Sequence, residues 1–250
     1  MKKKKLITVA IDSPAAAGAG TQAKLIAKHY NLLHLDTGRI YRFIGLIKIT
    51  SPKKFSHKYI QKKIKKLKIN DLDNKKLLSD KVAMTAAVIA KEKKIRYLVH
   101  RFQQKYAYSP PAKYYGSVLD GRDITSIQMK DAMFKFYITA SLNVRAKRRL
   151  LEFKKLGKKI TYNEVLKSLR NRDNLDKNRT YSPLKKTKDS IFRFLNIDRH
   201  LGGNLSASAG TTNVGYTCRG AGISMKERNK TICVEKDAIS ADIISYTYRF

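Results

Sequence analysis

Acidic residues are scarce in this chain, and long apolar runs are missing. The 250 residues include 19 Asp and Glu against 54 Lys and Arg, which gives a formal net charge of +35. No stretch approaches the roughly 18 consecutive apolar residues of a membrane-spanning helix, and the basic residues 1–5 are not followed by a signal-peptide cleavage pattern. We therefore expect a cytoplasmic protein that does not enter a membrane.

Cysteine is nearly absent, and its placement argues against two kinds of site. Cys218 and Cys233 are too far apart for a CxxC pair and have no histidines at metal-ligand spacing. The five histidines lack the sequence context of a catalytic triad. We therefore expect neither redox chemistry nor a metal ion held by the protein's own side chains.

The positive charge permits two explanations. A large cationic field attracts polyanions and is typical of nucleic-acid-binding proteins. Most of the excess is lysine, however, and it is spread along the chain with many Ile, Asn and Tyr residues, as in proteins from AT-rich genomes. A dedicated RNA-binding protein would carry clustered arginines and aromatics instead. We therefore do not expect a nucleic-acid partner, although the charge would attract nucleotides in either case.

Short apolar segments alternate with segments of helical periodicity over most of the chain. The sequence predicts strands at residues 6–11, 33–35, 117–119 and 134–139, and helices at residues 21–30, 39–49, 81–106, 142–156 and 163–170, with Gly157 as a helix cap. Strands that alternate with helices at these intervals form βαβ units with a parallel sheet. Ligands bind such sheets at the carboxyl ends of the strands.

Two segments depart from this alternation. Residues 51–80 are rich in lysine and are predicted to form a mobile insert with one amphipathic stretch near residues 60–67. From residue 191 onward glycine, Ser, Thr and Asn crowd the sequence, so we predict one domain over residues 1–190 and an atypical tail over residues 191–250. Residues 191–195 could add a strand, whereas the rest could be a disordered extension or a non-homologous end.

A loop of small residues, 13–21, joins the first strand to the first helix, and we call it the small-residue loop. Strand, small loop and helix is the order of a P-loop, in which backbone N–H groups cradle phosphate at a helix N-terminus. Ser13 stands where the pattern has its first glycine and Ala19 where it has lysine, while Lys24 is a candidate substitute cation. The candidate ATP-phosphate contacts are Ser13, Ala17, Gly18, Ala19, Gly20 and Thr21.

Four ordered blocks carry a resemblance to a known family. They are the strand, loop and helix above, LDTGRIYR at residues 35–42, LDGRD at 119–123, and RDNLDKNR at 172–179 followed by Ser182-Pro183-Leu184. From residue 7 to about residue 189 the chain resembles bacterial cytidylate kinase. The resemblance implies an α/β fold, namely a three-layer α/β/α P-loop domain with a parallel sheet, a short NMP-binding insert and a helical lid over about residues 142–180.

The resemblance also implies roles for individual residues. The residues implied for CMP binding are Thr37, Tyr41, Arg42, Arg96, Arg122, Asp123, Arg172, Asp176 and Arg179. Arg148 and Arg149 fall in the lid, and with Arg122 and Lys24 they are the candidates for stabilising charge during transfer. Tyr41 could instead be a core aromatic. Ala87 stands where the family often has a serine that contacts cytosine.

The implied reaction is transfer of the γ-phosphoryl group of ATP to CMP or dCMP with Mg²⁺, by a monomer. Such a transfer needs alignment and positive charge rather than a nucleophilic side chain. Because Ala19 removes the loop lysine, a protein that binds CMP without phosphorylating it is an alternative. A basic RNA-associated protein is a further alternative that the net charge leaves open.

Overall fold

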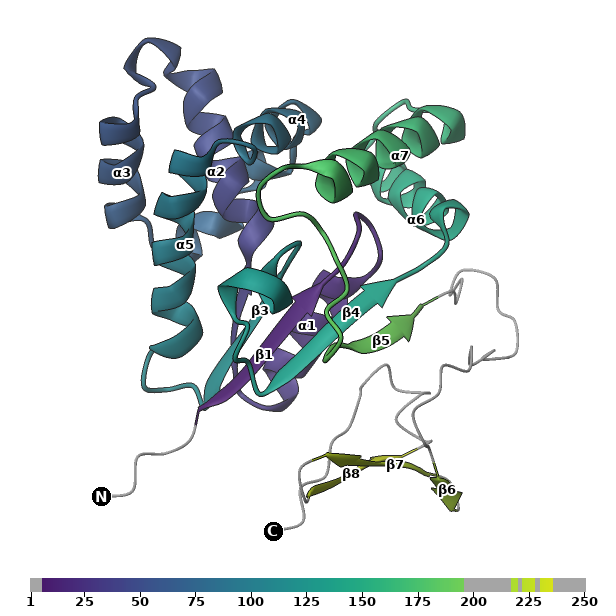
Figure 1. The fold of residues 1–250 in the computed structure, drawn as a ribbon. Helices are drawn as coiled ribbons and strands as arrows, with labels where there is room; N and C mark the ends of the chain where they lie inside the picture. The colour runs from purple at the N-terminus through teal and green to yellow at the C-terminus, as the bar shows by residue number, and fades with distance from the viewer. Residues whose placement is uncertain (1–5, 196–216, 220–221, 228–229, 236–250) are drawn as a thin grey trace. The chain divides into compact units, whose positions relative to one another are not determined.

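The computed structural model describes residues 6–195, 217–219, 222–227 and 230–235. The chain divides into two compact units, Met1–Asn196 and Ile197–Phe250. The first unit contains a parallel sheet with helices around it, which is the arrangement that the sequence predicts (Figure 1). No helix among the described residues is long and apolar enough to cross a membrane.

A five-stranded parallel sheet forms the centre of the first unit. Its strands are β1 (Ile7–Asp12), β2 (Leu33–Asp36), β3 (Gly116–Gly121), β4 (Phe134–Thr139) and β5 (Ile191–Phe194), in the order β2-β3-β1-β4-β5. The central strand β1 is almost wholly buried, because helices cover both faces of the sheet. The parallel α/β class predicted from the sequence is confirmed, as is the strand suggested at residues 191–195.

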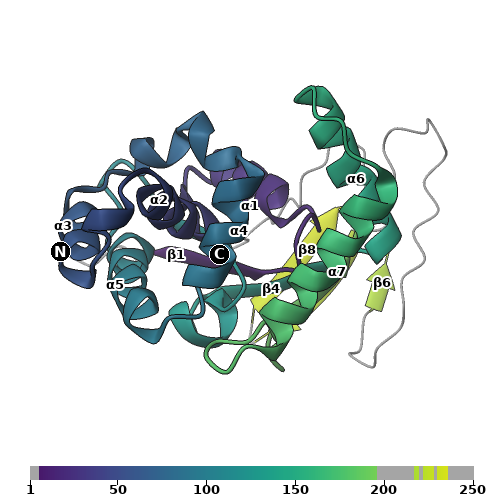
Figure 2. The ribbon, with the colours of Figure 1, turned by 90° about the horizontal axis from the view of Figure 1, so that it is seen from above.

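Among the residues that the structure describes, seven α-helices accompany this sheet. They are α1 (Ala19–His29), α2 (Thr37–Thr50), α3 (His57–Lys66), α4 (Asp80–Ile89), α5 (Lys93–Tyr108), α6 (Leu142–Lys155) and α7 (Tyr162–Asn178). Helices α1 and α5 lie on opposite sides of β1 (Figure 2), which gives three layers. The main core lies between the sheet, α2, α4 and α5, and includes Leu35, Ile44, Val99 and Leu119.

The lysine-rich insert is folded. It contains the short 3₁₀ helices η1 (Pro52–Lys54), η2 (Ile69–Asp73) and η3 (Lys75–Leu78) in addition to α3. Ile60 and Ile64, one turn apart on α3, are buried together with Leu72 and Leu77, while the lysines between them face solvent. The insert therefore joins the main core through a narrow apolar stripe.

The single helix predicted at residues 81–106 is wrong, because the structure has two helices there. Helix α4 ends at Ile89, and α5 begins at Lys93 after Glu92 leaves helical geometry. Five polar or small residues separate Ile89 from Ile95, and an unbroken helix would turn these two side chains to different faces. The break lets both be fully buried, and the carbonyl of Ala90 accepts a hydrogen bond from Arg96 Nη1 at 3.0 Å.

The predicted end of the last helix is also wrong, since α7 continues eight residues beyond Arg170 to Asn178. Its buried stripe begins with Val165 and Leu169 and continues with Asp173 and Asp176. Carboxylates at these positions hide the apolar periodicity that predicts a helix. Arg145 and Arg122 form ion pairs with these two carboxylates, which offsets the cost of burying them.

Helices α6 and α7 form a hairpin with a small core of its own, which includes Phe153 and Val165. The turn begins with a Schellman motif, in which Gly157 N–H donates to Lys154 O and Lys158 N–H to Phe153 O. Gly157 has a φ of +70°, so the glycine predicted as a cap is confirmed in that role.

The second unit contains a three-stranded antiparallel sheet of β6 (Thr217–Arg219), β7 (Gly222–Glu227) and β8 (Lys230–Glu235). Most of the predicted atypical tail, including residues 196–216 and 236–250, lies outside the described residues. The compact first unit extends six residues past the predicted boundary at 190, because β5 adds an edge strand to the main sheet.

Candidate active site

Three neighbouring strands carry an aspartate at or next to their carboxyl ends. In the register of the sheet Asp12 lies opposite Gly121, and Asp36 lies opposite Asp120. The turns that follow are joined by a hydrogen bond of 2.8 Å from Thr37 Oγ1 to Asp120 O. The carboxyl edge of the sheet therefore gathers polar side chains where parallel sheets bind ligands.

Asp12 anchors the turn after β3, a role that the sequence analysis missed. Its carboxyl group accepts hydrogen bonds from Ile124 N–H at 2.8 Å and from Thr125 N–H and Oγ1 at 2.8 and 2.6 Å. Complete burial raises the pKa of Asp12 to about 6, although these hydrogen bonds favour the ionised form. The turn includes a short π-helix, η4 (Ile124–Gln128), and Asp123 precedes it directly.

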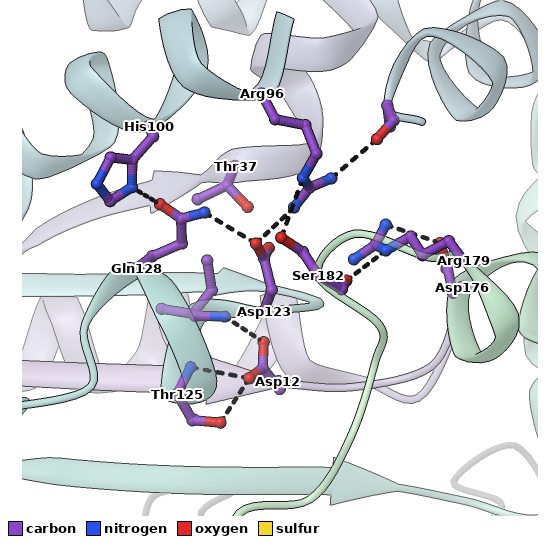
Figure 3. Close-up of polar contacts among 12 residues, drawn as sticks. Asp12, Thr37, Arg96, His100, Asp123, Thr125, Gln128, Asp176, Arg179 and Ser182 are labelled. Atoms are coloured by element: carbon purple, nitrogen blue, oxygen red, sulfur yellow. Dashed lines mark hydrogen bonds and ion pairs between the residues drawn. The ribbon is translucent and has the colours of Figure 1, made fainter. Parts of the chain in front are cut away.

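Asp123 and Arg96 form a buried ion pair at the centre of Figure 3. Arg96 Nη2 donates to Asp123 Oδ2 at 2.5 Å, and Arg96 Nε donates to Ser182 Oγ at 3.2 Å. Gln128 Nε2 donates to the same aspartate oxygen at 2.8 Å, and Gln128 in turn contacts His100. Burial opposes the charge of Arg96, but Tyr41 and Asp123 outweigh it and raise the pKa of the guanidinium.

Asp176, on α7, lies close to a second group of arginines. Arg122 Nε donates to Asp176 Oδ2 at 2.9 Å, and Arg179 Nη1 donates to Oδ1 at 3.4 Å. Arg172 Nε lies 4.0 Å from Oδ2, beyond hydrogen-bond distance. We call the six residues Arg96, Arg122, Asp123, Arg172, Asp176 and Arg179 the arginine–aspartate network. The sequence separates its members by up to 83 positions, yet the fold brings them together.

The network holds more positive than negative charge, and three buried polar atoms in it or beside it have no hydrogen-bond partner within the described part of the chain. Burial, and after it the neighbouring guanidiniums with Arg122 first, lower the pKa of Arg172 to about 10. Arg172 Nε, Arg179 Nη2 and Tyr41 Oη are buried without a hydrogen-bond partner among the described residues. Unsatisfied buried donors around clustered guanidiniums favour an anionic ligand.

Tyr41 and Arg42 lie on α2 beside this network. The ring of Tyr41 is part of the main core and lies 5.5 Å from the Arg96 guanidinium, so the packing role weighed for this residue is present. Arg42 Nη1 donates to Leu77 O at 3.0 Å in the insert. Burial lowers the pKa of Arg42, and Arg149 and Arg122 lower it as well, which places Arg149 within electrostatic range of the network.

The small-residue loop has the backbone course of an anion-binding turn. Gly18 has a φ of +94° and precedes α1, whose first N–H groups point towards the loop. Ala16 has a φ of +58°, which is strained for a residue with a Cβ atom. Ser13 N–H donates to Gly121 O at 3.2 Å, so the loop begins against the end of β3.

Neither Ala19 nor Lys24 brings a cation to this loop. Ala19 ends in a buried methyl group, and Lys24 is exposed to solvent on α1. Two arginines of α6 reach the loop instead: Arg145 Nη1 donates to Ala15 O at 3.1 Å and Arg148 Nη1 to Ala17 O at 3.3 Å. The sequence predicted Arg148 as a site residue, and the structure adds Arg145, which also pairs with Asp173 at 2.7 Å.

Most of the residues predicted for the site therefore lie near one edge of the sheet. Gln128 was missed because nothing in its local sequence marks it. Arg145 and Ser182 lie in segments that carry the family resemblance but had no individual role predicted, whereas Asp12 could have been found as the charged residue that ends a buried strand. Among the described residues, no group of three or more His, Cys, Asp or Glu is arranged to hold a metal ion.

Comparisons with known proteins agree on one family. A family model described as cytidylate kinase matches residues 9–194. A cytidylate kinase of Clostridium botulinum (strain Hall) is 37% identical over 196 residues, covering 74% of this chain and 88% of the relative. The cytidylate kinase of Bradyrhizobium sp. (strain ORS 278) is 37% identical over 183 residues, covering 73% and 84%.

A solved structure of an uncharacterized protein from Eubacterium ventriosum is 15% identical, with a TM-score of 0.43, and covers 78% of this chain and 89% of its own. The residues that the family model matches include the sheet edge, the small-residue loop and the arginine–aspartate network. This chain belongs to the cytidylate kinase family.

Proposed function

We propose that the protein transfers the γ-phosphoryl group of ATP to CMP or dCMP in the cytoplasm. The observation that carries this proposal is the arginine–aspartate network, in which four buried or half-buried guanidiniums face two carboxylates. Family membership supplies the identity of the ligand, and the network supplies the chemistry to hold it. CMP brings a phosphate for the guanidiniums, together with ribose hydroxyls and a base that carry hydrogen-bonding groups.

Different members of the network are suited to different parts of the acceptor nucleotide. Arg122 and Arg172, together with Arg42 on α2, would hold the phosphate, because guanidinium groups form parallel hydrogen bonds with phosphate oxygens. Asp176 would accept hydrogen bonds from the ribose, with Arg179 fixing its orientation. Arg96 and Asp123 form the preorganised pair closest to Tyr41, and we place the base near them.

The sheet edge fits a magnesium ion bound mainly through nucleotide phosphates. Asp120 Oδ2 lies 3.6 Å from the point where a Cβ atom on Gly20 would be, so a carboxylate faces the small-residue loop. Mg²⁺ in phosphoryl-transfer sites uses one or two carboxylates plus phosphate oxygens, and no larger cage is needed. Asp120 would hold the ion, which neutralises phosphate charge when bound.

The protein's own contribution is alignment and charge. The α1 amides and the small-residue loop would hold the donor phosphates, and the network would hold the acceptor phosphate on the other side of the sheet edge. An acceptor phosphate oxygen attacks the γ-phosphorus while the bond to ADP breaks, and the guanidiniums stabilise the charge that moves. The α6–α7 hairpin carries arginines that exclude water from this space.

A coupled assay of ADP formation tests the proposal with the full chain, ATP, Mg²⁺ and CMP. We expect ADP formation that depends on CMP and exceeds the rate with AMP in its place. Calorimetry with CMP alone should show one site per chain. The control is Arg101→Met, which removes an exposed arginine of α5 outside the network.

Two results would contradict the proposal. Binding of CMP without any CMP-dependent ADP formation would show a nucleotide-binding protein in place of an enzyme. A folded sample with neither CMP binding nor turnover would reject the acceptor assignment altogether. Tight RNA binding that weakens steeply with salt and ignores CMP would favour the RNA-associated alternative.

A further inference from the structure

The carboxylate of Asp123 has one oxygen that is fully used and one that is not. Two side chains donate to Oδ2, Arg96 through Nη2 at 2.5 Å and Gln128 through Nε2 at 2.8 Å. No described residue donates a hydrogen bond to the other oxygen, Oδ1. The unpartnered atoms Arg179 Nη2 and Tyr41 Oη belong to side chains within electrostatic range of this carboxylate. Asp123 therefore keeps an acceptor available in a place that also lacks partners for donors.

Gln128 reaches Asp123 because of the turn that it ends. The turn η4 is π-helical, and Gln128 N–H donates to the backbone carbonyl of Asp123 at 3.1 Å. This wider turn brings the fifth residue after Asp123 back beside it, so the two side chains meet. Gln128 is only 3% exposed, and leaving its amide without partners would be costly. The direction of this amide is therefore set by the protein groups around it.

His100 decides which way the Gln128 amide points. Its Nδ1 is hydrogen-bonded to Gln128 Oε1, and Figure 3 shows the amide between the imidazole and Asp123. A flipped amide would turn Oε1 towards the Asp123 carboxylate, where two acceptors repel each other. Because the amide oxygen only accepts, His100 Nδ1 carries the proton of this hydrogen bond. The half-buried imidazole thus keeps Gln128 Nε2 directed at Asp123.

One face of α5 supports the carboxylate both directly and through Gln128. Arg96 and His100 are four positions apart and therefore share a face of this helix. Gln104, a further turn along, donates to the backbone carbonyl of Gln128. Arg96 thus binds Asp123 itself, His100 fixes the side chain of Gln128, and Gln104 fixes its backbone. Asp123 Oδ2 is held by α5 and by η4 at once, which leaves the carboxylate little freedom to rotate.

We propose that His100 and Gln128 are positioning residues that fix the Asp123 carboxylate for recognition of the acceptor's base. The inference rests on the proposed function, which places that base near Arg96 and Asp123. A carboxylate oxygen accepts a hydrogen bond from the exocyclic amino group of cytosine, whereas uracil has a carbonyl oxygen at the same position. A carboxylate held with Oδ1 free therefore favours CMP over UMP. His100 and Gln128 act on this preference through Asp123 and not on the phosphoryl transfer itself.

Calorimetry with CMP and with UMP tests this inference on the full chain. The quantity compared is the Kd for UMP divided by the Kd for CMP, and the parent should bind CMP more tightly. His100→Leu and Gln128→Leu should each lower this ratio by about 10-fold, as expected when one charge-assisted hydrogen bond is misaligned. In the coupled assay kcat/KM for CMP should fall by a similar factor. The kcat at saturating CMP should fall by less than about threefold, because the lost interaction is one of binding.

His100→Asn and His29→Leu are the controls. Asparagine can place an N–H donor near the position of the imidazole Nδ1, so His100→Asn should keep most of the parent's ratio. His29→Leu removes an exposed imidazole on α1 and should leave the ratio unchanged. A variant that only loses stability would show fewer binding sites per chain with an unchanged ratio, because its folded molecules still bind normally. A thermal melt of each variant measures the folded fraction.

The outcomes distinguish this inference from the proposed function. An active parent whose ratio changes by less than about twofold in His100→Leu overturns the inference and leaves the function standing. Equal weakening of CMP and UMP binding also overturns it, as does a parent that binds the two nucleotides equally. If Gln128→Leu does not fold, the His100 variants decide alone. CMP binding without turnover contradicts the proposed transfer only, since the ratio still tests the inference, and a folded parent that does not bind CMP overturns both.

Discussion

The arginine–aspartate network and the small-residue loop handle negative charge in opposite ways. The network has full charges that its own carboxylates hold in place, as in the 2.5 Å pair between Arg96 and Asp123. The loop has no charged side chain of its own, and arginines from α6 lie against its carbonyls. The comparison teaches that one site can keep a rigid, self-contained half while the other half depends on an element that packs against it.

The largest expected effect comes from breaking the buried pair in the network. Asp123→Ala leaves the Arg96 guanidinium buried without its carboxylate, which should lower the free energy of unfolding by about 3–5 kcal/mol. Asp73→Ala is the matched control, because Asp73 pairs with Arg39 at 2.7 Å but is mostly exposed. It should cost no more than about 1 kcal/mol in urea denaturation. Equal losses would show that the two pairs do not differ as their burial suggests.

The next effect separates activity from stability within the network. Arg122→Met should reduce CMP-dependent turnover by about 100- to 1000-fold, because it removes a donor that the proposed function assigns to the acceptor phosphate. Asp176 would keep Arg179 as a partner, so the protein should remain folded. The coupled assay and calorimetry with CMP measure both parts. A variant with parental kcat and KM would remove Arg122 from the site.

The third effect concerns Asp12, beneath the turn that carries Asp123. Because its pKa is raised to about 6 in the folded protein, its contribution to stability is fully present below the unfolded pKa. That contribution falls as the pH rises through about 6, by roughly 3 kcal/mol at 1.36 kcal/mol per pKa unit. The stability advantage of the parent over Asp12→Asn should therefore shrink between pH 4 and 7. Urea denaturation across this range measures it, and a constant difference would contradict the raised pKa.

The smallest effect tests strain in the loop. Ala16→Gly should raise the free energy of unfolding by about 0.5–1 kcal/mol, because glycine adopts the left-handed region without the cost of a Cβ atom. Ala17→Gly is the control, since Ala17 is buried and does not have a positive φ, and it should be destabilising. A melting temperature about 2 °C higher for Ala16→Gly is the expected reading. A lower one would mean that the Ala16 methyl contributes more by packing than it costs in strain.

The two regions also differ in how far the sequence predicts them. Parallel strands, the small-residue loop and the motifs that hold Arg122, Asp123 and Asp176 follow from local patterns and from the family resemblance. The break between α4 and α5 does not, since it depends on burying both Ile89 and Ile95 against a core that only the folded chain has. The length of α7 was missed for a related reason, because Asp173 and Asp176 look like surface residues until Arg145 and Arg122 are placed beside them.

The side-chain contacts of the small-residue loop were the feature least predictable from the sequence. Ala19 shows from the sequence that a cation is missing, but no local pattern says which of the many basic residues lies nearby. The hydrogen bonds from Arg145 and Arg148 depend on the angle at which α6 leaves β4 after Ala140. The roles of individual site residues in binding CMP and ATP remain predictions, for which the experiments above supply the measurements.

Gly121 sets how closely two of the turns can approach. A Cβ atom there would be 2.9 Å from a side-chain carbon of Ile124 and nearer still to Thr37 Oγ1. Alanine at this position would thus wedge the β2 and β3 ends apart and break the Thr37 hydrogen bond to Asp120. The residues accepted in one turn therefore depend on the residue present in the other. A library that randomises residues 37 and 121 together should recover functional pairs that libraries of either position alone do not contain.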